Sequence, residues 1–181
     1  MQLFIASSQS KKVESVCYHC GEDCDTEVVK FESHNFCCNG CKTVYELLDQ
    51  NGLSDYYALE EQPGNSLKTP RHVDQFEYLD NEEIANQLLD FKDEKRSKVT
   101  LFVASIRCSS CIWLLENLHR LQPAVVFSRV NFVKKEVYIT FSKMITLREI
   151  VELVTSLGYE PKITLKGIEQ KEKEADKPLL Y

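Results

Sequence analysis

The sequence predicts a mixed α+β fold in which a small cysteine-rich unit precedes a larger βαββαβ unit of the ferredoxin-like kind. Three observations lead to this prediction. The eight cysteines fall into two clusters, six of them before residue 42 and two near residue 110. The short spacings in the first cluster are typical of small folds that are held together by a metal ion. In the second half of the chain, apolar stripes of strand and helix period alternate in the order strand, helix, strand, strand, helix, strand.

Composition excludes several classes of protein. The chain has 181 residues, of which 43% are apolar, and a net charge of -6. This charge argues against nucleic acid as a partner. The apolar start, residues 1–6, is short and has no basic region, so it is not read as a signal peptide. No stretch approaches the roughly 20 apolar residues of a membrane helix. Eight thiols without an export signal predict a reducing, cytoplasmic location.

The expected organisation has five parts. They are a disordered N-terminus (1–15), a cysteine-rich metal-binding unit (16–59), a linker with one short helix (60–97), the βαββαβ unit (98–165) and a charged tail (166–181). For the linker helix, Asp80 and Glu83 resemble a capping box, and the apolar stripe that follows is Ile84, Leu88 and Phe91.

The first half of the βαββαβ unit is read from its apolar pattern. A buried strand covers Val99–Ser105. A helix over Ile112–Leu121 follows, and Pro123 prevents it from continuing. Its apolar face has helical spacing and consists of Cys111, Leu114, Leu115 and Leu118. The second strand alternates with period two, which turns one set of residues toward the core: Val126, Ser128, Val130 and Phe132.

The second half completes the pattern. A third strand alternates Val137, Ile139 and Phe141. Thr146 and Glu149 form a capping box for the second helix, whose apolar face is Leu147, Ile150, Val151, Val154 and Leu157. Gly158 suits the position after that helix, and a last strand covers Tyr159–Leu165. Both helices are expected on one face of the sheet.

The cysteine pair Cys108 and Cys111 lies between the first strand and the first helix of this unit. We expect an exposed corner, where the helix N-terminus and Arg107 lower the thiol pKa values. Two thiolates suffice for Cu(I), whereas zinc normally takes four ligands. The pair is therefore predicted to bind Cu(I) and to release it to an incoming thiol. A thioredoxin-like dithiol and two ordinary thiols remain alternatives, and His119 is read as an exposed helix residue.

The first cluster consists of two knuckles on either side of a strand-like stretch, which indicates a zinc ribbon or treble clef. The preferred zinc ligands are Cys17, Cys20, Cys38 and Cys41, with Cys37 as the alternate to Cys38. Cys24 is left over, and His19 and His34 are read as solvated surface residues. A helix with the apolar stripe Val44, Leu47 and Leu48 follows and ends at Asn51-Gly52.

Both clusters carry a family resemblance. A βαββαβ unit with Ser105-Ile106-Arg107-Cys108-Ser109-Ser110-Cys111 resembles the heavy-metal-associated domain, in which Gly-Met precedes x-Cys-x-x-Cys and Ile106 here replaces the methionine. Leu157-Gly158-Tyr159 and Val130-Asn131-Phe132 resemble further signatures of that domain. Cys111–Glu116 is similar to copper-transporting P-type ATPases linked to cbb3-type oxidase assembly, and the cysteine-rich segment resembles the N-terminal domain of the same ATPases.

This resemblance implies an N-terminal cytoplasmic region that receives Cu(I) at Cys108 and Cys111 from a copper chaperone or another thiol donor. The ion would pass to the membrane and ATP-binding parts of the parent transporter, while zinc or copper occupies the first cluster. The chain itself has no Asp-Lys-Thr-Gly and no Cys-Pro-Cys motif, so no catalytic residue is assigned in it. A free-standing chaperone or metal-binding module and a dithiol oxidoreductase are the alternatives.

Overall fold

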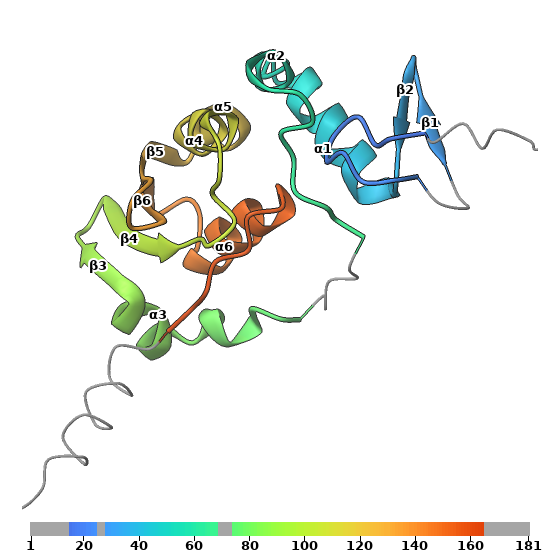
Figure 1. Ribbon diagram of the computed structural model, residues 1–181. Coiled ribbons are helices and arrows are strands. Elements are labelled where there is room, and N and C mark those ends of the chain that lie inside the picture. Colours follow the sequence, from blue (N-terminus) through green and yellow to red (C-terminus); the bar gives the residue numbers. More distant parts are fainter. Residues whose placement is uncertain (1–14, 25–27, 69–73, 165–181) are drawn as a thin grey trace, which may run out of the picture.

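The computed structural model describes residues 15–24, 28–68 and 74–164, so the expectations for both chain ends lie outside the described residues. The predicted mixed α+β class is confirmed (Figure 1). The elements are β1 (Val29–Phe31), β2 (His34–Phe36), α1 (Asn39–Gln50), α2 (Asp55–Leu59), the 3-10 helix η1 (Glu77–Asp80), α3 (Glu82–Leu88), β3 (Leu89–Lys92), β4 (Arg96–Phe102), α4 (Ser109–Glu116), α5 (Leu118–Leu121), β5 (Val125–Asn131), β6 (Glu136–Ser142) and α6 (Leu147–Ser156).

The larger sheet has the strand order β3-β4-β6-β5, and all neighbouring strands are antiparallel. The alternation predicted for β6 is confirmed, because Val137, Ile139 and Phe141 are all buried. These residues pack with the apolar faces of α4 and α6 in one core. The sheet therefore supports the turn between β4 and α4, which carries Cys108.

The edge of this sheet differs from the prediction. The last strand expected at Tyr159–Leu165 is reduced, within the described residues, to a single bridge between Phe102 and Lys162. Pro161 has no N–H to donate, which limits pairing there. The edge beside β4 is formed instead by β3, from the stretch read as linker. Asp93 stabilises this hairpin by accepting hydrogen bonds from the backbone of Lys95 and Arg96.

Two further corrections concern single residues. A β-bulge between Val125 and Phe127 shifts the register of β5, so Val126 is exposed rather than turned toward the core. The helix after the cysteine pair is interrupted at Asn117, whose side-chain amide donates to the Trp113 carbonyl at 2.7 Å and separates α4 from α5. The four residues of its predicted apolar face are nevertheless all buried.

Helix ends follow local chemistry. The capping box of Thr146 and Glu149 at α6 is confirmed, and Gly158 has the expected positive φ of 92°. At α3, Asn81 rather than Asp80 is the cap, because its side chain accepts from the backbone of Glu83 and Ile84. Phe91 lies on β3 and is exposed, since the helix ends at Leu88.

The cysteine-rich part packs against the sheet-containing part. Val44, Leu48, Leu53 and Tyr56 belong to the same buried cluster as the residues of α4, α6 and the sheet. The Tyr56 and Tyr159 hydroxyls lie 2.9 Å apart, and the Asn65 side chain donates to the Gly158 carbonyl at 3.1 Å. Within the described ranges, no helix is long and apolar enough to cross a membrane.

Candidate metal centres

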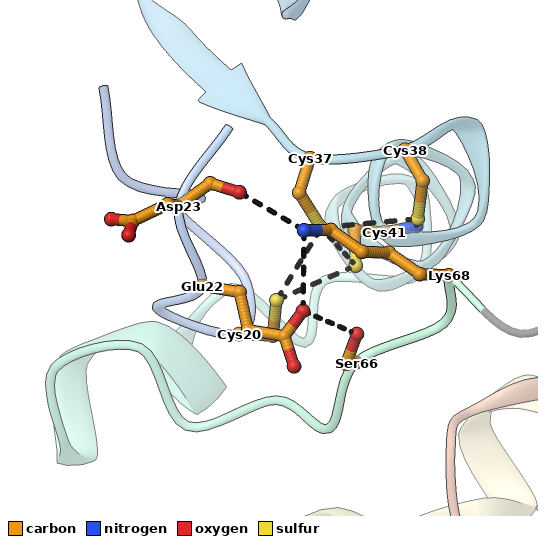
Figure 2. Close-up of polar contacts among 8 residues, drawn as sticks. All are labelled: Cys20, Glu22, Asp23, Cys37, Cys38, Cys41, Ser66 and Lys68. Carbon is orange, nitrogen blue, oxygen red and sulfur yellow. Dashed lines mark hydrogen bonds and ion pairs between the residues drawn. The ribbon is translucent and has the colours of Figure 1, made fainter. Parts of the chain in front are cut away.

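Four cysteines of the first cluster form a compact group, which we call the sulfur group. The sulfur atoms of Cys17, Cys20, Cys37 and Cys41 all lie within 4.8 Å of one another. Three of the Sγ–Sγ distances are 3.6 Å (Cys20–Cys37), 3.7 Å (Cys37–Cys41) and 3.8 Å (Cys20–Cys41). Figure 2 shows these three side chains converging from the first knuckle and from the start of α1.

Local structure brings the two knuckles together. The turn after Cys17 is closed by a hydrogen bond from Gly21 N–H to the Cys17 carbonyl, and Gly21 adopts a positive φ of 77°. The β1–β2 hairpin leads to Cys37, and Cys41 lies in the first turn of α1. Lys68 stabilises the segment after the first knuckle, since it donates to the Asp23 carbonyl and forms an ion pair with Glu22 (Figure 2).

The donor set fits one tetrahedral ion. Zinc–thiolate bonds of about 2.3 Å place the sulfurs of a tetrahedral site about 3.8 Å apart. The observed separations of 3.6–3.8 Å match this value. Without an ion, hydrogen bonds from Cys20 and Cys41 lower the pKa of the Cys17 thiol well below its usual range. Hydrogen bonds to Cys17 and Cys20 raise the pKa of Cys41. These opposite shifts follow from the close contact of the sulfurs with one another.

The second knuckle does not use the sulfur that its spacing favoured. Cys38 lies outside the sulfur group, and Cys37, the alternate in the prediction, lies within it. Cys38 is instead the N-cap of α1, and its sulfur accepts a hydrogen bond from Cys41 N–H at 3.5 Å. Cys24 is buried outside the group, and its backbone N–H donates to the Ser15 carbonyl.

The two histidines of this region are not solvated as expected. His19 is fully buried, and its Nδ1 lies 2.8 Å from the Tyr57 hydroxyl. Burial lowers the pKa of His19 to about 4. The ring lies against Gly64, where an added Cβ would be 2.1 Å from Nε2, so only glycine fits at that position. His34 is half-buried and stacks on the Tyr18 ring, with 3.7 Å between centroids.

The second cysteine pair lies at the start of a helix, as predicted. Cys108 is the N-cap of α4, Cys111 is in its first turn, and the Cys111 N–H donates to the Cys108 sulfur at 3.4 Å. Both are free thiols, and their sulfurs are 2.8 Å apart. His119, on α5, is exposed.

The environment of this pair corrects two expectations. Cys111 is fully buried and Cys108 is half-buried, so the corner is not exposed. Burial, and next the hydrogen bond with Cys111, raise the pKa of Cys108 to about 12, which reverses the lowering expected from the helix terminus. Arg107 is directed elsewhere, because its guanidinium donates to the Gly64 carbonyl at 2.6 Å.

Residues far away in sequence cover the pair, and the sequence patterns did not identify them. Ser109 donates from its backbone N–H (3.1 Å) and its hydroxyl (2.6 Å) to the Glu60 carboxylate. Tyr56 and Tyr159 lie close enough to the pair for Cys111 to influence the pKa values of both tyrosines. Ile106, two residues before Cys108, is fully buried.

We expect Glu60→Gln to speed the reaction of Cys108 with an aromatic disulfide reagent by about threefold, because hydrogen bonds to a carboxylate are about twice as strong as those to a neutral amide. Glu61→Gln is the matched control, since it removes the same charge from the adjacent exposed residue. Stopped-flow thiol assays on the reduced, metal-free chain measure the rates. Equal rates for both variants would show that the Glu60 contact does not restrict access.

Comparison with known proteins agrees with the position of the sulfur group. Residues 16–93 match the family model described as "Putative metal-binding domain of cation transport ATPase". This match covers 78 of the 181 residues. No curated protein matches the chain. The stretch from residue 16 to residue 93 is therefore similar to the metal-binding domain of cation-transport ATPases, and it contains all four cysteines of the sulfur group.

Proposed function

We propose that the chain is the cytoplasmic metal-binding region of a copper-transporting P-type ATPase. In this proposal Cys108 and Cys111 bind Cu(I) and hand it on, and Cys17, Cys20, Cys37 and Cys41 hold Zn(II). The observation that carries it is a four-sulfur group of tetrahedral dimensions within a segment similar to the metal-binding domain of cation-transport ATPases.

The sulfur group has the chemistry of a structural zinc site in a ribbon or treble-clef-like unit. Four thiolates close the coordination shell of zinc and leave no position for a substrate. Cys17 and Cys41 are fully buried, which suits an ion that stays in place. The hairpin β1–β2 followed by α1 supports this assignment, because two knuckles converge there from separate elements.

The pair at α4 has the chemistry of a transfer site in a ferredoxin-like, heavy-metal-associated unit. Cu(I) is soft and accepts low coordination, so two sulfurs suffice. The sulfurs are 2.8 Å apart and would have to separate to share an ion. Cys108 is the more accessible of the two, so we infer that a donor thiol, such as that of a copper chaperone, approaches from its side. The Glu60 carboxylate, which accepts hydrogen bonds from Ser109, would have to move aside for that donor.

Titration with Cu(I) against a strong competing chelator tests this assignment. The double variant Cys108→Ser, Cys111→Ser is expected to lose one high-affinity Cu(I) equivalent and to retain its zinc. The matched control is Ser109→Ala, Ser110→Ala, which changes the first turn of α4 but keeps both thiols. An unchanged copper stoichiometry in the double cysteine variant would refute the assignment, whatever the zinc content.

A dithiol oxidoreductase is the second candidate, because two free sulfurs at 2.8 Å are well placed to form a disulfide. Its attacking thiol would need a lowered pKa, however, and burial raises that of Cys108. We therefore favour metal transfer. A free-standing chaperone or metal-binding module would use the same two sites. It would differ from a transporter region only in lacking the membrane and ATP-binding parts.

A further inference from the structure

The sulfur group has a fifth neighbour. Cys38 Sγ lies 4.0 Å from Cys37 Sγ, a separation close to the 3.6–3.8 Å found within the sulfur group. Both residues immediately precede α1, and both are half-buried. Of the two remaining positions in this cluster, only Cys38 is in sulfur contact with the group, because Cys24 makes no such contact within the described residues.

Cys38 is held in place at the start of α1. Its sulfur already accepts the N–H of Cys41, the ligand in the first turn of α1 (Figure 2). Cys38 and Cys41 also have the two-residue separation of the first knuckle, Cys17 and Cys20, and this separation is common among zinc knuckles. Cys38 thus lies beside the sulfur group as a fifth sulfur, in contact with Cys37.

We propose that Cys38 is an alternative fourth ligand, and that the ion exchanges between a set containing Cys37 and a set containing Cys38. This inference rests on the proposed metal site. In the exchange, the bond from the ion to Cys38 Sγ forms and the bond to Cys37 Sγ breaks. The proton that leaves the Cys38 thiol is taken up by the Cys37 thiolate, so charge and protons balance. Three sulfurs, those of Cys17, Cys20 and Cys41, hold the ion throughout.

Such an exchange has a chemical consequence for the site. A soft or borderline divalent ion in a closed set of four thiolates is released slowly, because an external ligand finds no open position. When a fifth sulfur beside the group binds the ion, one of the four original ligands can leave while the ion stays four-coordinate. Cys37 then becomes the free thiol, on the half-buried side of the cluster. The structure thus provides for a metal that can be exchanged as well as held.

Co(II) absorption tests the proposal, because the sulfur-to-cobalt charge-transfer band reports the number of bound thiolates. The parent is the full chain with Cys108→Ser and Cys111→Ser, so that only the first cluster contributes. Cys37→Ser and Cys38→Ser, made singly, are each expected to keep the full band. The variant with both substitutions is expected to lose about one quarter of it, since one of four thiolates is gone. Cys24→Ser is the control and should change nothing.

Exchange kinetics form the second arm. Cys38→Ser is expected to slow the transfer of bound Cd(II) to a chelator several-fold, with no change in stoichiometry. If Cys37→Ser alone loses the fourth thiolate, or fails to fold with metal, Cys38 does not substitute and the proposal is overturned. An unchanged transfer rate in Cys38→Ser overturns the exchange. A parent chain that shows no four-thiolate spectrum would instead overturn the proposed metal site itself.

Discussion

Replacing Cys41 with serine is expected to unfold the cysteine-rich part and to abolish its high-affinity metal binding. Cys41 is fully buried, and its sulfur, 3.7 Å from Cys37 and 3.8 Å from Cys20, belongs to both of the ligand sets proposed above. Structural zinc sites contribute on the order of 10 kcal/mol to small domains at neutral pH. The remaining buried residues of this local core are Cys17, Cys24 and Phe36, too few to replace that contribution.

Hydrogen exchange with mass spectrometry measures this effect along the chain. In the zinc-loaded parent, we expect protected amides in β1, β2 and the start of α1. In Cys41→Ser, these amides should exchange at nearly unfolded rates, whereas β4, β5 and β6 keep their protection. Cys24→Ser is the matched control, since Cys24 is also buried but lies outside the sulfur group. Protection that persists around β1 and β2 in Cys41→Ser would mean that the part folds without metal.

The sequence was informative wherever short-range chemistry decides the structure. The period-two stripe of Val137, Ile139 and Phe141 and the capping box of Thr146 and Glu149 involve residues at most four positions apart, and both are found as predicted. Which cysteine of the second knuckle joins the sulfur group was harder to predict. Adjacent cysteines differ only in which side of the chain their sulfurs lie on, and the backbone at Cys38 is extended (φ -163°, ψ 165°) and turns its sulfur toward the α1 N-terminus.

Contacts between distant segments were beyond the sequence patterns. The Glu60 carboxylate and Ser109 are 49 positions apart, and neither position carries a motif that points to the other. The hairpin of β3 and β4 was missed for a local reason, because the short run of Leu89–Lys92 directly follows α3 and resembles its continuation. Burial raises the pKa of Cys108, and the Glu60 carboxylate raises it further. Reasoning from the helix N-terminus alone therefore predicted a lowered pKa for the Cys108 thiol, which is the wrong direction.

Tyr56→Ala is expected to lower the free energy of unfolding of the metal-loaded chain by about 3–5 kcal/mol, the usual cost of removing a large buried aromatic side chain. Tyr56 is fully buried, and it packs in the cluster that joins α1 and α2 to α4 and α6. Its loss should therefore affect both parts of the chain. Tyr56→Phe separates packing from hydrogen bonding, because it removes only the hydroxyl that lies 2.9 Å from Tyr159. We expect a loss of about 1–3 kcal/mol for it, the cost of leaving one buried polar group unpaired.

Urea denaturation, followed by near-UV absorption of the tyrosines and by Trp113 fluorescence, distinguishes the two ways in which the chain can unfold. Trp113 is on α4, so its fluorescence reports the sheet-containing part, whereas Tyr18, Tyr45 and Tyr57, which remain in Tyr56→Ala, bring the cysteine-rich part into the tyrosine signal. If the shared core couples these parts, both signals move to lower urea together in Tyr56→Ala, and the cysteine pair becomes reactive at the same urea concentration. If the Trp113 signal instead keeps the midpoint of the parent, the segment that carries Tyr56 and Glu60 unfolds away from Cys108 and Cys111 while α4 stays folded. In that case Glu60 and Tyr56 would govern access to the pair without contributing to the stability of the fold beneath it.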